Sequence, residues 1–477
     1  MDKPRHIHLI GICGTAMAAL AGMLRQREYH VTGSDTAAYP PMSDFLASMG
    51  IEVRQPYAEA NLIPRPDLVI VGNAISRGNV ELERLLDDRI PFRSLPQVLY
   101  EEFLAGHEPI AIAGTHGKTT TTSILSWIFQ SAGRSPSFLV GGIAENFGRS
   151  FTLGEGRQFI LEADEYDTAF FDKGPKFLHY FPDSVILTSV EFDHADIYRD
   201  LEAVKTAFRR LVNVVPRRGV VIAHDNPSNV GDVVSRAFCS VERYGFTAQA
   251  DWQAVDLRFE PEQTTWTVLH EGQVWSRFGF SLPGEFNVLN ATAAAAMASH
   301  YGIEPPAIAK ALRTFKSVKR RQEVKAEVDG ITIIDDFAHH PTAIAGTLKA
   351  LRTRYDGRRL WAVLEPRSNT LRRSVFQDEL VDSLSEADAV IVGGVFYKTT
   401  DPIPERERLD TATVVKTLNE NGKLARQISD VDQIVKQLVA DVRPGDVVAI
   451  LSNGGFGGIY EKLPRALKHS REVITKG

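Results

Sequence analysis

The amino-acid sequence predicts an α/β protein of three domains, and three observations carry this prediction. Short apolar segments that are typical of strands alternate with helix-like stretches, which is the pattern of parallel sheets with helical crossovers. The series of strands restarts twice along the chain. At 477 residues, the chain is also too long for one ordinary hydrophobic core.

The first domain is expected over residues 1–108. Strands alternate with helix-like stretches in it, namely at residues 6–10, 16–26, 30–35, 40–50 and 68–75. Strands separated by helices pair in parallel, and each helix then covers one face of the sheet. This order of elements predicts a Rossmann-like domain.

Two further series of strands define a central and a C-terminal domain. The central domain is expected over residues 109–324, with strands and one alanine-rich helix at residues 109–113, 159–164, 184–191, 219–224 and 290–300. The C-terminal domain is expected over residues 325–477 and is also Rossmann-like, with strands that start near residues 330, 359, 389 and 446. Each strand is followed by polar or glycine residues, where α/β proteins place their ligands.

Composition excludes several classes of function. The net charge of -6 gives no general basic surface, so nucleic acid and anionic membranes are not expected partners. Two cysteines, Cys13 and Cys239, are too few and too far apart for a disulfide framework or a four-ligand zinc site, which indicates a reducing, cytoplasmic environment. The apolar stretch after the basic amino terminus is interrupted by glycines and lacks a convincing cleavage site, so it does not read as a signal peptide.

The strongest motif is GTHGKTTT, from Gly114 to Thr121, between an apolar strand and a helix. Backbone N–H groups of such a loop bind phosphates at the positive end of a helix. Lys118 would neutralise phosphate charge, and the Thr119 hydroxyl would bind Mg²⁺. The strict phosphate-loop spacing is not met, because its first glycine would fall at Ile112. A plain strand-to-helix turn is the alternative, but ATP binding is the favoured interpretation.

Acidic side chains follow two strands of the same domain. The first group is Glu162, Asp164, Glu165 and Asp167, and the second is Glu191, Asp193, His194 and Asp196. Carboxylates near bound phosphates are suited to Mg²⁺, and two such ions stabilise phosphoryl transfer. The alternatives are a solvated acidic turn for the first group and a hydrogen-bonded loop histidine for the second.

The amino-terminal turn has the general features of a nucleotide diphosphate site. Gly11 and Gly14 follow the first strand and precede a helix, and Asp35 follows the second strand, where an acid can contact ribose hydroxyls. The GxGxxG pattern is absent, so NAD binding and a plain structural turn are alternatives.

Three segments late in the chain offer charged side chains for substrates. Residues 319–323 form a basic junction between the second and third domains, which is either a solvated linker or a contact with an anionic substrate. The pairs of acids and histidines at residues 335–341 are interpreted as a loop that positions an amine, because no second ligand cluster supports zinc. Arg367, Arg372 and Arg373 follow a strand of the third domain, where they either form a solvated helix start or, if the substrate is a peptide, bind its carboxylates.

In this order, the motifs resemble those of the Mur ligase family along nearly the whole chain. The matching motifs are GICGTAM, GTHGKTTT, EADEYD, EFDHAD, GEFNVLNA, KRRQE and DDFAHHPTAI. The resemblance implies an N-terminal UDP-binding domain, a central ATPase and a C-terminal domain that brings the amino substrate. It implies an ADP-forming amide ligase that uses ATP and Mg²⁺, acts on UDP-N-acetylmuramate with a peptide or amino acid, and is a monomer or homodimer.

The resemblance also assigns roles to single residues. The expected catalytic residues are Lys118, Glu162, His194, Arg321 and Asp336, and the expected metal ligands are Thr119, Glu162 and His194. The expected ATP-binding residues are Gly114, Thr115, Gly117, Lys118, Thr119, Thr120, Asn287, Asn290 and Arg321, with the two asparagines facing adenine. The expected substrate-binding residues are Gly11, Gly14, Ser34, Asp35, Asn73, His339, His340 and Arg367.

Within the family, the sequence most resembles ligases that attach the tripeptide L-alanyl-γ-D-glutamyl-meso-diaminopimelate to UDP-N-acetylmuramate in peptidoglycan recycling. The alternative is the ligase that attaches L-alanine, which commonly has serine where Tyr166 stands. Two positions depart from the family pattern, since Phe286 replaces a histidine and Ser189 an asparagine. From other classes, a nucleotide-gated binding protein or an NAD-dependent oxidoreductase remains possible.

Overall fold

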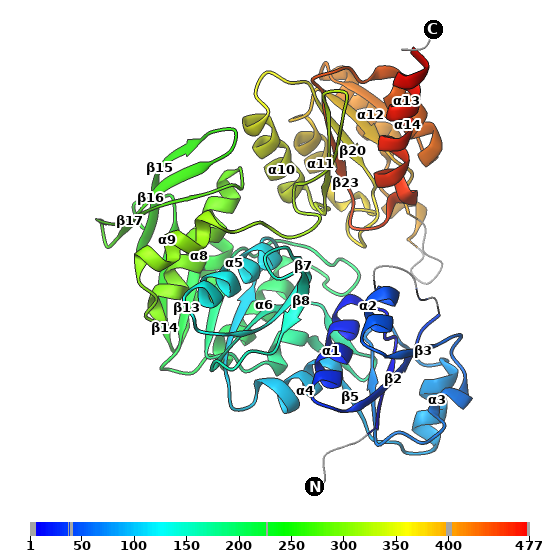
Figure 1. The fold of residues 1–477 in the computed structure, drawn as a ribbon, viewed down its shortest axis with the longest axis vertical. Coiled ribbons are helices and arrows are strands. Elements are labelled where there is room, and N and C mark those ends of the chain that lie inside the picture. Colours follow the sequence, from blue (N-terminus) through cyan, green and yellow to red (C-terminus); the bar gives the residue numbers. More distant parts are fainter. Residues whose placement is uncertain (1–5, 37, 39–41, 226–227, 397–402, 475–477) are drawn as a thin grey trace.

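The computed structural model describes residues 6–36, 38, 42–225, 228–396 and 403–474, and its strands form three main sheets. The three-domain α/β fold is therefore confirmed. Figure 1 shows the N-terminal domain in blue and the C-terminal domain in yellow to red, each beside the larger central domain. None of the described helices is both long and apolar enough to cross a lipid bilayer.

The N-terminal sheet has five parallel strands in the order β3-β2-β1-β4-β5. The strands are β1 (His6–Ile10), β2 (His30–Ser34), β3 (Glu52–Arg54), β4 (Leu68–Val71) and β5 (Phe92–Ser94). The helices are α1 (Thr15–Gln26), α2 (Met42–Ser48), α3 (Val80–Asp87) and α4 (Leu95–Leu99). The chain builds the sheet outward on one side from β1 to β3 and then continues on the other side with β4 and β5. Sheets of this kind bind ligands in the crevice at the carboxyl ends of the two strands where the order switches, which here are β1 and β4.

The central sheet has ten strands in the order β17-β16-β15-β14-β13-β12-β6-β9-β7-β8. The strands are β6 (Glu108–Ala113), β7 (Ser137–Ala144), β8 (Arg149–Thr152), β9 (Gln158–Ala163), β12 (Ser184–Leu187), β13 (Val220–His224), β14 (Ser240–Gly245), β15 (Trp252–Phe259), β16 (Thr264–His270) and β17 (Gln273–Phe280). A separate hairpin pairs β10 (Asp167–Ala169) with β11 (Asp172–Pro175). The antiparallel extension β15-β16-β17 was not predicted from the sequence.

The central helices are α5 (Lys118–Ser131), α6 (Leu201–Val214), α7 (Ser228–Val234), α8 (Glu285–His300) and α9 (Pro305–Arg313). Helix α8 is the alanine-rich helix, and its residues from Ala293 to Ala298 are completely buried in the domain core. Because alanine has a small side chain, α8 can lie close to α5, as Figure 1 shows. This packing brings the start of α8 beside the start of α5.

The C-terminal sheet has the order β18-β19-β23-β20-β21-β22, and all neighbours are parallel except β18 and β19. The strands are β18 (Glu323–Val328), β19 (Ile331–Asp336), β20 (Leu360–Leu364), β21 (Ala389–Val392), β22 (Leu424–Gln427) and β23 (Val447–Leu451). The helices are α10 (Pro341–Arg354), α11 (Gln377–Leu384), α12 (Thr411–Glu420), α13 (Val431–Asp441) and α14 (Ile459–Ile474).

The third series of strands begins earlier than the sequence indicated. Strand β18 starts at Glu323, seven residues before the predicted start at 330, because this edge strand carries charged residues and does not read as a buried strand. The boundaries at 108 and 324 remain a prediction. The N-terminal and central domains share apolar packing, since Phe151 of β8 lies in the same hydrophobic cluster as α1.

Candidate functional site

The loop from Gly114 to Gly117 joins β6 to α5, and its two glycines are required by close packing. Gly114 has φ 129° and Gly117 has φ 80°, both in the region that favours glycine. A Cβ atom on Gly117 would lie 2.6 Å from Oδ1 of Asn290, and one on Gly114 would lie 2.7 Å from the backbone nitrogen of Ser189. The loop is thus fixed between α8 and the end of β12. No side chain caps the start of α5, which leaves its N–H groups available to an anion.

Lys118, the first residue of α5, lies inside the site. Its Nζ atom is 2.9 Å from Oε2 of Glu165 and 2.6 Å from the carbonyl oxygen of Gly114. Burial alone would lower the pKa of Lys118, but the charges of Glu165 and Asp164 outweigh burial and raise it. The ammonium group is therefore charged and fixed at the loop.

Thr119 and Glu162 form an oxygen-rich pair beside the loop. The Thr119 hydroxyl donates to Oε2 of Glu162 at 3.2 Å and accepts from Nη2 of Arg321 at 3.1 Å. The backbone N–H of Gly141 donates to the other carboxylate oxygen of Glu162 at 2.5 Å. A hydroxyl and a half-buried carboxylate offer the oxygen ligands that Mg²⁺ prefers, so these residues fit the predicted ion.

His194 lies in a second cluster, with Asp164 and Glu165, whose ligand atoms are all within 4.8 Å of one another. Nε2 of His194 is 3.6 Å from Oε1 of Glu165. Burial would lower the pKa of His194, but the hydrogen bond and charge of Glu165 raise it to about 9. Glu165 is 2% exposed and contacts both Lys118 and His194, so it is a central residue that the predicted site left without a role. Its place in the acidic motif was the available signal.

We expect alanine at Glu162 or at His194 to raise the Mg²⁺ concentration needed for activity or to abolish activity. We expect both side chains to act on the same metal chemistry, so the double variant should be little worse than the worse single variant. The measurement is steady-state turnover across a Mg²⁺ titration for the three variants. Fully additive losses would indicate separate roles, and unchanged Mg²⁺ dependence would remove both residues from the metal site.

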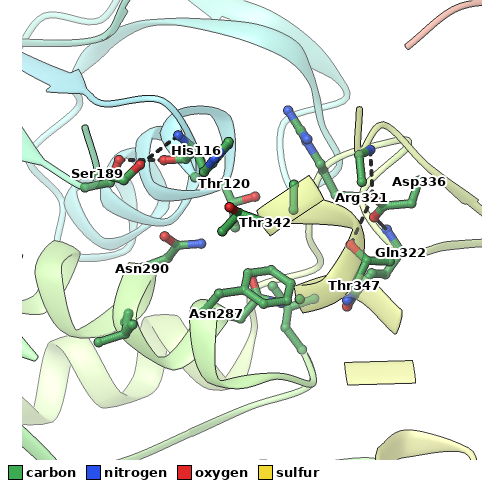
Figure 2. A pocket seen from close by; sticks show the side chains of 18 of the residues that line it. His116, Thr120, Ser189, Asn287, Asn290, Arg321, Gln322, Asp336, Thr342 and Thr347 are labelled. Carbon is green, nitrogen blue, oxygen red and sulfur yellow. Dashed lines mark hydrogen bonds between the residues drawn. The ribbon is translucent and has the colours of Figure 1, made fainter. Parts of the chain in front are cut away.

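A cavity of about 280 Å³ lies between the central and C-terminal domains (Figure 2). Figure 2 shows Asn287 and Asn290 of α8 below His116 of the loop and Thr120 of α5. Arg321 lies beside the ribbon of the C-terminal domain. Asn290 is 6% exposed and its amide nitrogen has no hydrogen-bond partner, which suits a ligand. The Asn287 amide nitrogen already donates to the Pro283 carbonyl oxygen at 2.8 Å.

Asp336, at the end of β19, lines the same cavity, but its carboxylate oxygens already accept hydrogen bonds from the protein. Its carboxylate accepts from the backbone N–H groups of Gln322 and Ala338, both at 2.8 Å, and from the Thr347 hydroxyl at 3.2 Å. Burial raises the pKa of Asp336. These contacts fix the turn that carries Arg321, so the geometry favours a positioning role for Asp336.

The phosphate loop is tied to the end of β12 by two side chains. The Thr115 hydroxyl accepts from the Glu191 backbone N–H at 2.9 Å, and the Ser189 hydroxyl accepts from the His116 backbone N–H at 3.0 Å. Thr115 therefore contributes to loop geometry through its side chain, and Ser189 supports the loop where the family pattern has asparagine. Thr120 lines the cavity of about 280 Å³ that also contains Asn290.

A second cavity of about 270 Å³ lies beside His194, where the central and C-terminal domains meet. Its lining includes Tyr166, His194, His339, Arg367 and Asn369. The guanidinium carbon of Arg367 is 3.8 Å from the centre of the Phe396 ring. A Cβ atom on Gly454 would lie 2.7 Å from that same carbon, so glycine is needed for this placement.

The expectation that Arg372 binds a substrate carboxylate is wrong. Its side chain is 2% exposed, and Nη2 donates to Oδ1 of Asn369 at 3.3 Å. Arg373 lies outside the cavity lining and 3.9 Å from Glu407. Of the three arginines in this motif, Arg367 alone lines the second cavity.

The adjacent histidines His339 and His340 point into different parts of the structure. His339 lines the second cavity, whereas His340 is 5% exposed and lies 3.7 Å from Oε2 of Glu191. Burial lowers the pKa of His340 to about 4, so its ring is neutral. The placement of His340 does not support a direct substrate contact.

The predicted UDP-binding residues gather at the carboxyl ends of β1, β2 and β4. Oδ2 of Asp35 accepts from the backbone N–H of Cys13 at 2.9 Å, which places this carboxylate at the turn between Gly11 and Gly14. Asn73 is half-buried in the loop after β4. The structure does not support a side-chain contact from Ser34, which is fully buried.

Glu81 is the reason that Ser34 is unavailable. The Ser34 hydroxyl donates to Oε2 of Glu81 at 2.5 Å, and this carboxylate also accepts from Asn61 at 2.5 Å and from the backbone N–H of Ala58 at 3.1 Å. His8 lies 3.4 Å from the same carboxylate. A buried charge with these partners holds the loop after β3 against the sheet.

Three family models match the chain in sequence order. The Mur ligase family catalytic domain matches residues 6–106, the Mur ligase middle domain matches 112–298, and the Mur ligase glutamate ligase domain matches 320–454. Together they cover most of the chain and agree with the three sheets.

Individual relatives match nearly end to end. The UDP-N-acetylmuramate–L-alanyl-γ-D-glutamyl-meso-2,6-diaminoheptandioate ligase of Escherichia coli (strain K12) is 43% identical, with 98% of this chain and 99% of the relative covered. A UDP-N-acetylmuramate–L-alanine ligase of Geotalea daltonii is 31% identical, with 98% and 99% covered. The crystal structure of a murein peptide ligase from Psychrobacter arcticus 273-4 is 36% identical, with a TM-score of 0.74 over 97% of this chain and 99% of that one.

Proposed function

The chain belongs to the Mur ligase family of carboxylate–amine ligases, and from this premise we propose that it joins UDP-N-acetylmuramate to the tripeptide L-alanyl-γ-D-glutamyl-meso-diaminopimelate. The observation that carries the proposal is the end-to-end identity of 43% with the tripeptide ligase, against 31% and 35% with two L-alanine ligases. The cavity that contains Arg367 supports it, because a tripeptide brings carboxylates that free alanine lacks.

ATP and Mg²⁺ are the proposed co-substrate and cofactor. Adenine would occupy the cavity at Asn290, and the triphosphate would extend to the N-terminus of α5. Thr119 and Glu162 would hold one Mg²⁺ and His194 a second, and these ions would supply charge stabilisation for the phosphate oxygens when they are bound. Location in the cytoplasm and assembly as a monomer or homodimer stay predictions.

The reaction follows from the chemistry of a carboxylate, which is a poor electrophile. A carboxylate oxygen of the UDP-sugar attacks the γ-phosphorus, the bond to the β,γ-bridging oxygen breaks, and ADP leaves. The amine nitrogen then attacks the carbonyl carbon of the acyl phosphate, loses a proton and expels phosphate, which forms the amide bond. Lys118 and the N–H groups of α5 would stabilise charge on the transferring phosphate, and Arg321 would orient the site through Thr119.

The second cavity is suited to hold the amine substrate. It is lined by both His194 of the central domain and Arg367 of the C-terminal domain. An amine held there by its distant carboxylate would lie next to the metal cluster, where the acyl phosphate forms.

ADP formation tests the proposed reaction against a nucleotide-gated binding protein. We expect sustained ADP formation over many turnovers to require UDP-N-acetylmuramate and tripeptide together, with one amide formed per ADP released. The measurement is coupled ADP detection with product analysis by mass spectrometry, omitting one substrate at a time. ATP hydrolysis that is independent of both substrates would contradict the ligase assignment.

A further inference from the structure

Two histidines and a glutamate meet outside the proposed Mg²⁺ site. His116 comes from the phosphate loop, Glu191 follows β12, and His340 precedes α10 of the C-terminal domain. Nε2 of His116 is 3.3 Å and Nδ1 of His340 is 3.7 Å from Oε2 of Glu191. The three ligand atoms all lie within 4.8 Å of one another. Nothing in the proposed reaction uses these side chains.

The hydrogen bond of His340 to a backbone carbonyl leaves the lone pair of its Nδ1 atom available to a metal. Its Nε2 atom lies 3.2 Å from the carbonyl oxygen of Phe192, and a carbonyl can only accept, so Nε2 carries the hydrogen. Nδ1 therefore has the lone pair and faces Glu191. A histidine that binds a metal commonly donates its other ring N–H to a backbone carbonyl in this way.

Thr342 makes the remaining contacts at the cluster. Its backbone N–H lies 3.3 Å from Nδ1 of His340, a long contact that a metal would replace. Its hydroxyl donates to Oε2 of Glu191 at 2.6 Å, which holds the carboxylate in place.

We propose that His116, Glu191 and His340 form a second metal site, which binds a transition ion such as Zn²⁺ and ties the phosphate loop to the C-terminal domain. Ligand atoms 2.0–2.1 Å from a tetrahedral ion are about 3.3 Å apart, close to the two observed separations. Two imidazoles and one carboxylate suit Zn²⁺, whereas Mg²⁺ prefers oxygen ligands.

A bound ion would act on domain motion. Of its ligands, two belong to the central domain and one to the C-terminal domain, so the ion stabilises the arrangement in which the domains are in contact. His116 and Glu191 also line the nucleotide cavity. The ion would therefore oppose the separation of domains that nucleotide exchange requires.

Co²⁺ is the probe for the test, because four-coordinate Co²⁺ with nitrogen ligands absorbs visible light. We expect Co²⁺ titration of the whole nucleotide-free protein, in the presence of excess Mg²⁺, to give this absorption, and Zn²⁺ to displace it. His340→Asn should weaken binding at least about 10–100-fold. Asparagine can still cap α10, so this variant preserves the local structure.

His194→Asn and His339→Asn are the matched controls. The first disrupts the proposed Mg²⁺ cluster and the second changes the neighbouring histidine, and both should retain the Co²⁺ absorption. Absorption that is lost in His194→Asn and kept in His340→Asn would place the ion in the Mg²⁺ cluster and overturn the proposal. Absence of absorption in the unmodified protein would also overturn it. His116→Gln gives a second variant if His340→Asn fails to fold.

Discussion

Lys118→Ala is expected to lower the rate of acyl phosphate formation by at least about a hundredfold, which is the cost of removing one preorganised donor from a transition state. Lys118 is the first residue of α5, and we expect its charge to stabilise the phosphate that transfers. The rate is best measured as ADP formation in a single turnover with saturating UDP-N-acetylmuramate, so that later steps do not mask the chemistry.

Lys118 also has structural partners, so the variant needs a control for its fold. It contacts Glu165 and the Gly114 carbonyl oxygen, and its loss would leave the negative charge of the buried acidic cluster with one positive partner fewer. Lys176→Ala is the matched control, because Lys176 lies 2.8 Å from Asp164 in the same cluster but outside the loop. An equal loss in both variants would assign the effect to the acidic cluster, and near-normal chemistry in folded Lys118→Ala would contradict the loop assignment.

The phosphate loop could be predicted from the sequence because its signal is local. A strand, two glycines, a lysine and a helix follow one another without a gap, and the positive φ angles of Gly114 and Gly117 show why glycine stands at these positions. The two restarts of the strand series likewise follow from local apolar patterns. The N-terminal Asp35 was placed correctly at the end of its strand, since strand ends in a parallel sheet meet at one edge.

The direction of a single side chain could not be predicted, because it depends on contacts between distant segments. His339 and His340 are adjacent, yet the first lines the second cavity and the second faces Glu191. Arg367 and Arg372 belong to one motif, yet Arg372 is buried. A charged residue type predicts that a partner exists but does not identify the partner.

The antiparallel strands β15 to β17 were missed for a related reason. They extend the edge of a parallel sheet, and their pairing is set by neighbours in the fold and not by a helix-strand alternation in the sequence. Glu165 was missed because four acids within six residues look equivalent until the fold shows that one of them contacts both Lys118 and His194.

The choice of amine is expected to depend on Arg367. We expect the tripeptide to support a much higher kcat/KM than L-alanine, with UDP-N-acetylmuramate and ATP held constant. Arg367→Ala should lower kcat/KM for the tripeptide about 10- to 100-fold, because a charged hydrogen bond contributes about 1.5–3 kcal/mol. The same substitution should have a smaller effect on an analogue whose diaminopimelate carboxylate is an amide.

Arg373→Ala is the matched control from the same motif and should affect both amines equally, since Arg373 does not line the cavity. Because Arg367 already stacks on Phe396 and lies 3.5 Å from Glu365, the guanidinium is preorganised, and the loss should appear mainly when a substrate carboxylate is left unpaired. Equal or better turnover with L-alanine would reassign the amine substrate while leaving the ligase chemistry unchanged.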